Sequence, residues 1–108
     1  MITWITGNSG SGKTTLANSM RVNLTDVILD GDAMRNVWQD LGFSEADRRT
    51  QNVRVARLAL ELERQGFHVI VATICPYRTL RAEIQKMTGC NFIYLKGGKV
   101  GPEYPYEK

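Results

Sequence analysis

The residues with the clearest chemical potential form a glycine-rich loop near the start of the chain. Its members are Gly7, Asn8, Ser9, Gly10, Ser11, Gly12, Lys13, Thr14 and Thr15. Glycines at this spacing allow backbone N–H groups to converge on a phosphate, and the positive end of a following helix dipole adds to the attraction. Lys13 can then reach the β- and γ-phosphates of a nucleotide, and the Thr14 hydroxyl can bind Mg²⁺. The loop alone does not identify the group that receives the phosphate.

The residues on either side of this loop distinguish a phosphate site from an ordinary glycine- and serine-rich turn. The apolar residues Ile2, Trp4 and Ile5 predict a buried strand before the loop. The residues that follow it predict a helix over 13–22. A strand, a glycine-rich turn and a helix in this order indicate a nucleotide-binding loop.

Two carboxylates, Asp30 and Asp32, follow the second predicted strand. Ligands of open parallel sheets bind beyond the carboxyl ends of the strands, so we expect these side chains beside the phosphate loop. One carboxylate can take the proton of an acceptor hydroxyl, and the other can lie near Mg²⁺. The alternative is a plain turn, because Asp-Gly-Asp is also good turn chemistry.

Arginine and carboxamide side chains follow on two predicted helices. Arg35 lies in the first turns of one helix, and Arg48 opens the next. Gln51 and Asn52 come three and four residues after Arg48 and therefore share its face. Such a face can hold an anion and a base or ribose, or it can be a solvated helix surface; the spacing leaves both open.

The rest of the chain alternates strands with helices. The predicted strands cover 2–6, 27–29, 67–72 and 91–95, and the predicted helices cover 13–22, 34–41, 44–65 and 80–88, with an irregular segment over 97–108. A capping box at Ser44 and Asp47 begins the long helix. This alternation predicts an α/β fold, a P-loop NTPase-like three-layer sandwich with a parallel sheet of about four strands. The length of 108 residues predicts one kinase domain over 1–108, with 97–108 as a shortened tail.

The composition narrows the class of protein. Hydrophobic residues make up 43% and charged residues 23%, the balance of a soluble globular protein. No apolar run approaches the roughly 18 residues of a membrane span, so we expect a cytoplasmic protein without membrane contact. The net charge of +3 suits anionic small molecules, and no basic run favours nucleic acid. Cys75, Cys90 and His68 lack the spacing of a zinc site or a disulfide scaffold, and we expect a structural role for His68.

The order of these motifs resembles the adenylyl-sulfate kinase (APS kinase) family. The matching stretches are the phosphate loop, Leu29-Asp30-Gly31-Asp32-x-x-Arg35, Leu41-Gly42-Phe43-Ser44-x-x-Asp47-Arg48 and Ile74-Cys75-Pro76-Tyr77-Arg78. This family transfers the γ-phosphate of ATP to the 3′-hydroxyl of adenosine 5′-phosphosulfate (APS) and gives PAPS. The resemblance implies ATP and Mg²⁺ as cofactors, APS as the small-molecule substrate and a homodimer, as family members are commonly dimers.

The resemblance also implies roles for individual residues. Asp30 acts as the base on the 3′-hydroxyl, and Lys13 is the second catalytic residue. Arg35 and Arg48 hold the phosphosulfate end, while Phe43 stacks on the substrate adenine. The backbone of residues 74–76 reads the edge of that adenine. The complete predicted substrate-binding set is Asp32, Arg35, Phe43, Arg48, Gln51, Asn52, Ile74, Cys75 and Pro76.

Two substitutions depart from the family pattern within this site. Gln51 stands where the family has asparagine, and Asn52 follows about 100° further round the helix, so either amide can make the contact. Cys75 replaces a serine, and a buried small residue is a better interpretation of it than a reactive thiol.

The largest departure follows Leu95. The family continues through a basic lid segment, whereas this chain passes directly to the end of the next motif, with Lys99 at the position of a phenylalanine. Lids exclude water and complete catalytic sites. Three functions therefore stay open: a minimal APS kinase, a kinase for another nucleotide or small hydroxyl acceptor, and a catalytically weak ATP/APS-binding module. Lys96 or Lys99 either replaces a lid cation or belongs to a solvated tail.

Overall fold

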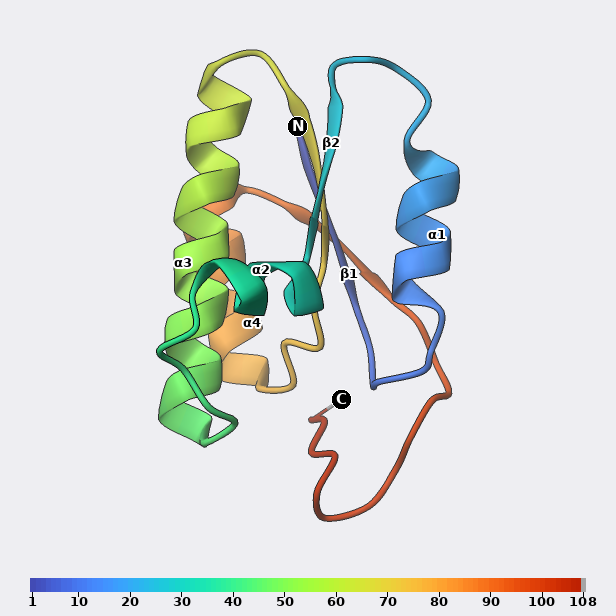
Figure 1. Ribbon diagram of the computed structural model, residues 1–108, viewed down its shortest axis with the longest axis vertical. Coiled ribbons are helices and arrows are strands. Elements are labelled where there is room, and N and C mark those ends of the chain that lie inside the picture. The colour runs from blue at the N-terminus through green and yellow to red at the C-terminus, as the bar shows by residue number, and fades with distance from the viewer. Residues whose placement is uncertain (108) are drawn as a thin grey trace.

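A single parallel sheet of four strands organises the structure, a computed structural model that describes residues 1–107 (Figure 1). The strands are β1 (Ile2–Thr6), β2 (Asp26–Asp30), β3 (His68–Ala72) and β4 (Asn91–Tyr94), in the order β2-β3-β1-β4. Every neighbouring pair is parallel, so all four carboxyl ends lie at one edge of the sheet. The predicted irregular tail is irregular as far as Glu107, and Lys108 lies outside the described residues.

Helices cover both faces of the sheet (Figure 1). Helix α1 (Lys13–Met20) lies on one face, α3 (Glu45–Arg64) and α4 (Arg78–Thr88) lie on the other, and the short α2 (Gly31–Val37) follows β2 directly. The predicted three-layer α/β sandwich is confirmed. Among the described residues, no helix is both long and apolar enough to cross a membrane.

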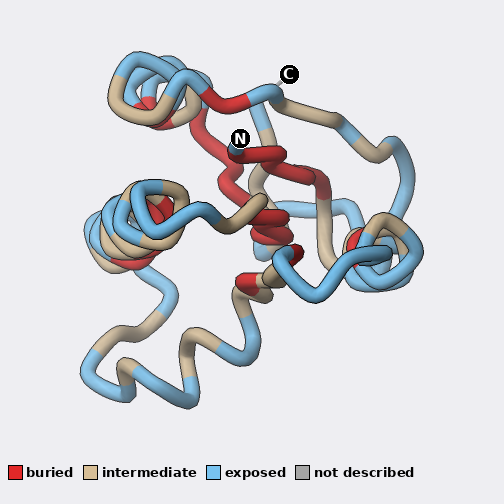
Figure 2. Tube along the Cα trace, turned by 90° about the horizontal axis from the view of Figure 1, so that it is seen from above, coloured by how far each residue is buried: buried red, intermediate tan, exposed pale blue. Residues whose placement is uncertain are grey.

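The core explains why apolar residues occupy adjacent positions in the central strands. Trp4 packs with the α3 and α4 side, whereas its neighbour Ile5 packs with α1. Adjacent residues of a strand point to opposite faces, and here both faces are covered, so both positions exclude water. Figure 2 shows the buried residues concentrated along these strands.

Three predicted boundaries, in helices α1 and α2, need correction. Helix α2 begins at Gly31 rather than residue 34, because the Asp30 side chain accepts a hydrogen bond from the backbone N–H of Asp32 and caps it. It ends at Val37 instead of residue 41, so Arg35 lies in its last turn. Helix α1 ends at Met20, two residues earlier than expected.

Two other predicted ends agree with the structure, whereas α4 starts at Arg78, two residues earlier than expected. The Ser44 hydroxyl accepts a hydrogen bond from the backbone N–H of Asp47, which confirms the predicted cap of α3. Gly89 ends α4 in the left-handed conformation, with φ of 66°.

A buried chain of hydrogen bonds joins β1, the end of β3 and α3. The indole N–H of Trp4 donates to the hydroxyl of Thr73 (2.9 Å), and that hydroxyl donates to Oδ1 of Asn52 (2.7 Å). Nδ2 of Asn52 in turn donates to the carbonyl of Arg48 (2.9 Å). This chain fixes the start of α3, which carries the candidate substrate residues, against the sheet.

Thr73→Val tests the importance of this chain for stability. Valine keeps the shape of threonine but leaves the Trp4 indole N–H and the Asn52 carbonyl oxygen buried without partners, at a cost of about 2–3 kcal/mol in unfolding free energy. Urea unfolding measures the change. Thr50→Val on exposed α3 surface is the matched control and should change stability by less than about 0.5 kcal/mol. Equal effects of the two substitutions would contradict the interpretation.

Candidate functional site

Three loops meet at the carboxyl edge of the sheet, and two of them are the phosphate loop and the residues after β2 that the sequence predicts to lie side by side. They surround a cavity of about 370 Å³. Its lining comes from the phosphate loop, from the start of α2 and from the residues after β3; it consists of Ser9, Gly10, Gly12, Lys13, Thr14, Thr15, Asp30, Gly31, Asp32, Ala72, Thr73 and Ile74.

The phosphate loop turns tightly between β1 and α1. The backbone N–H of Ser11 donates to the carbonyl of Asn8 (3.1 Å), and the Lys13 ammonium donates to the same carbonyl (2.9 Å). Oδ1 of Asn8 and Oγ of Ser11 are buried without hydrogen-bond partners among the described residues. Buried polar atoms normally find partners, so these two are available to a polar ligand.

Lys13 lies between the loop and two carboxylates. Burial lowers the pKa of Lys13, and the negative charges of Asp30 and Asp32 act in the opposite direction. A bound polyphosphate would add further negative charge and stabilise the ammonium form.

Thr14 and Asp30 converge from different elements. The Thr14 hydroxyl donates to Oδ2 of Asp30 (2.6 Å), and Oδ1 of the same carboxylate accepts from the N–H of Asp32 (2.9 Å). One hydroxyl and one carboxylate beside a phosphate loop fit Mg²⁺, which is usually bound by one or two carboxylates together with substrate phosphates and waters. Residues 1–107 contain no cluster of three or more His, Cys, Asp or Glu that could hold a metal without a substrate.

A second cavity, of about 90 Å³, lies beside the first. The structure brings all nine predicted substrate residues together in its lining, which consists of Gly31, Asp32, Arg35, Phe43, Arg48, Gln51, Asn52, Thr73, Ile74, Cys75 and Pro76. Gly31 and Thr73 were absent from the predicted set, although both follow strands at the ligand edge. Both also line the first cavity, as do Asp32 and Ile74, so the two cavities meet there.

Arginines give the second cavity its positive charge. Burial, and then the like charge of Arg48, lower the pKa of Arg35. The Arg35 guanidinium lies 4.2 Å from the centre of the Phe43 ring and donates to the carbonyl of Gly42 (2.8 Å). Within residues 1–107, neither arginine forms an ion pair. Two neighbouring cations without a bound carboxylate favour an anionic ligand.

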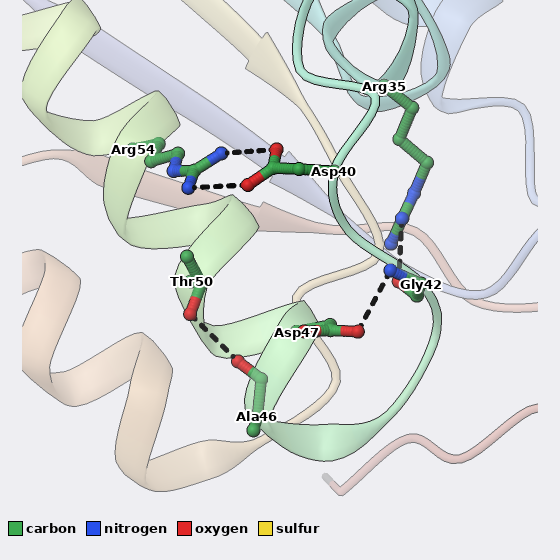
Figure 3. Close-up of polar contacts among 7 residues, drawn as sticks. All are labelled: Arg35, Asp40, Gly42, Ala46, Asp47, Thr50 and Arg54. Carbon is green, nitrogen blue, oxygen red and sulfur yellow. Dashed lines mark hydrogen bonds and ion pairs between the residues drawn. The ribbon is translucent and has the colours of Figure 1, made fainter.

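The loop between α2 and α3 carries Phe43 and is tied to two residues of α3 (Figure 3). Arg54 of α3 donates to both carboxylate oxygens of Asp40, at 2.8 and 3.0 Å. The backbone N–H of Gly42 donates to the Asp47 carboxylate (2.9 Å). The loop is therefore fixed, while the Phe43 ring itself remains 70% exposed and accessible to a partner.

The two neighbouring amides differ in their availability. Asn52 uses both ends of its amide within the buried chain described above. Gln51 makes only a long contact from Nε2 to the carbonyl of Gly31 (3.4 Å), and its Oε1 is buried without a partner among the described residues. Gln51 is thus the amide that has a free acceptor in the cavity.

Neither cysteine is a candidate nucleophile. Cys75 is a buried free thiol, and burial raises its pKa to about 12. Cys90 is also buried and free. His68 lies at the opposite end of the sheet, between Thr3 (3.1 Å) and Asp26 (3.4 Å), which confirms its predicted structural role.

Comparison with known proteins shows which family this chain resembles. Residues 1–96 match the sequence model of the family described as adenylylsulphate kinase. An adenylyl-sulfate kinase of Burkholderia ambifaria is 46% identical over 87 residues, which are 75% of this chain and 48% of that protein. This chain spans about half the length of the curated relatives it matches.

Two solved structures show the same similarity. An APS kinase of Mycobacterium tuberculosis in complex with AMPPNP and APS superimposes with a TM-score of 0.73 and 33% identity, over 86% of this chain and 59% of that one. A hexameric APS kinase from Thiobacillus denitrificans has a TM-score of 0.74 and 32% identity, over 86% of this chain and 21% of that one. The chain belongs to the adenylylsulphate kinase family.

Proposed function

We propose that residues 1–108 form one kinase domain that transfers the γ-phosphate of ATP to the 3′-hydroxyl of APS. The observation that carries this proposal is the meeting of the two cavities at Asp32 and Ile74, beside Asp30. A phosphoryl donor in one cavity and a hydroxyl acceptor in the other would meet at that point. The complex of the Mycobacterium tuberculosis relative with AMPPNP and APS supports the choice of ligands.

The phosphate loop would bind the donor. Its backbone N–H groups would surround the β-phosphate, and the Lys13 ammonium would exchange the carbonyl of Asn8 for phosphate oxygens. Thr14 would hold Mg²⁺, with Asp32 of the same cavity nearby, and the bound ion would neutralise charge on the phosphates.

The second cavity would bind the acceptor. Arg35 and Arg48 would pair with the phosphosulfate group, and the exposed face of Phe43 would stack on the adenine. The attacking 3′-oxygen would form its bond to the γ-phosphorus as the bond to the β–γ bridging oxygen breaks and ADP leaves. The Asp30 carboxylate would accept the proton of the hydroxyl.

A second candidate is a module that binds ATP and APS with slow transfer. The 70% exposure of Phe43 favours it, because no second aromatic ring covers the acceptor site among residues 1–107 and exclusion of water speeds transfer. A kinase for another small hydroxyl acceptor is the remaining alternative. Radiolabelled ATP with APS separates the three: PAPS forms in the first case, APS binds with little PAPS in the second, and ATP binds without APS in the third.

The assembly is also a proposal. We infer a homodimer from the family resemblance, and light scattering coupled to size-exclusion chromatography measures it directly.

Asp30→Asn should reduce PAPS formation by about 10²- to 10⁴-fold, the usual contribution of a general base. Asparagine still caps α2, so the melting temperature should change little. Glu83→Gln, at an exposed position of α4, is the matched removal of a carboxylate and should leave the rate unchanged. A rate for Asp30→Asn close to that of the unmodified protein would exclude Asp30 as the base.

Gln51→Met should raise KM for APS by about tenfold, because the acceptor Oε1 is lost, while KM for ATP stays the same. The free energy of unfolding should not fall, because the substitution removes a buried atom that has no partner among the described residues. Asn52→Leu should instead lower the unfolding free energy by about 2–3 kcal/mol, because it interrupts the buried chain. Steady-state kinetics and urea unfolding give both values. The reverse pattern would assign the substrate contact to Asn52.

A further inference from the structure

The segment after β4 packs directly on the phosphate loop. The backbone N–H of Lys99 donates to the carbonyl of Ser9 (2.8 Å). A Cβ atom added to Gly98 would lie 2.6 Å from the same carbonyl oxygen, 3.0 Å from the N of Ser11 and 3.1 Å from the carbonyl oxygen of Asn8. These are backbone atoms, so a side chain at position 98 would force the loop or the segment to move.

The other end of this segment is attached to the loop after β3. The N–H of Glu107 donates to the carbonyl of Pro76 (2.7 Å), and its carboxylate accepts from the N–H of Arg78 (2.9 Å), at the start of α4. The Tyr106 hydroxyl lies 3.0 Å from the Thr6 hydroxyl. Figure 1 shows the segment passing below the carboxyl ends of the strands between these two attachments.

We propose that residues 97–107 act as a clasp that holds the phosphate loop and the loop after β3 in fixed relative positions, with Gly98 as its positioning residue. Apart from the bond of Thr14 to Asp30 and the Gly12 carbonyl that accepts from the N–H of Leu16, the ties of the phosphate loop are the contacts of Ser11 and Lys13 with the Asn8 carbonyl. Its clasp contact therefore orders the N–H groups before a phosphate arrives, which lowers the entropy cost of binding.

The clasp also joins the two ligand cavities. One attachment is on the donor loop, and the other is at Pro76, which lines the acceptor cavity. A ligand that orders one loop thus reduces the cost of ordering the other, and such coupling is reciprocal. The match to the family model ends at residue 96, so the clasp lies in the part of this chain that the match does not cover.

Gly98→Ala and Gly97→Ala form a matched pair for the test. Both glycines have left-handed backbones, with φ of 79° and 101°, so alanine is strained at either position. Only Gly98 has neighbours in the way, since nothing lies within 4 Å of a Cβ placed on Gly97. The difference between the two variants therefore isolates the contact with the phosphate loop.

Hydrogen exchange without ligand gives the first readout. Gly98→Ala should speed amide exchange over residues 8–12 by at least about fivefold relative to Gly97→Ala. Equal exchange in the two variants would overturn the clasp. This measurement does not depend on the proposed function, because no nucleotide or APS is present.

AMPPNP binding gives the second readout and rests on the proposed function. The Kd for AMPPNP with Mg²⁺ should rise at least about fivefold in Gly98→Ala but not in Gly97→Ala. AMPPNP should also slow amide hydrogen exchange over residues 74–78 in Gly97→Ala. In Gly98→Ala, AMPPNP should leave the exchange of these residues unchanged. Equal affinities, or protection of residues 74–78 in both variants, would overturn the clasp. Absence of AMPPNP binding to the unmodified chain would instead overturn the proposed function.

Discussion

The arrangement of both cavities depends on two hydrogen bonds that the Asp30 carboxylate accepts. One oxygen caps α2, and the other accepts the hydroxyl hydrogen bond of Thr14 at the start of α1. The same short side chain therefore joins a helix on one face of the sheet to the helix that leads into the acceptor loop. Because both bonds come from neutral donors to a carboxylate, they are stronger than ordinary hydrogen bonds and hold the group in one orientation.

Two features of the second cavity are unfavourable in the ligand-free protein. Arg35 and Arg48 repel one another, and the acceptor atom of Gln51 is buried without a partner among the described residues. Both cost stability in the ligand-free protein. An anionic ligand with donor groups of its own would relieve both at once. Contacts around the cavity keep these groups in place. The main ones are the ion pair of Arg54 with Asp40 and the buried hydrogen-bond chain through Thr73.

Much of this arrangement was predictable from the sequence, because the parallel sheet gathers the ends of its strands. Loops after β1, β2 and β3 had to meet, and motif spacing placed Arg48 and Gln51 on one face of α3. The predicted start of α2 was wrong because the prediction relied on the spacing of apolar residues and ignored the cap that Asp30 forms. The sequence could not tell which of Gln51 and Asn52 has a free amide oxygen. The oxygen of Asn52 accepts from the hydroxyl of Thr73, which lies 21 residues further along the chain. The packing of Gly98 on the phosphate loop likewise depends on a tertiary contact without a local sequence signal.

The burial of both thiols has a practical consequence. Cys75 lies in the loop after β3 and Cys90 directly before β4, and burial raises the pKa of each. A thiol-specific reagent therefore reacts with the folded chain only when a region opens, since thiolate and access are both required. Identifying the labelled cysteine by mass spectrometry would then distinguish opening near the acceptor cavity from fraying at the edge strand. The molecule thus contains two natural probes of its local opening, and neither requires an engineered label.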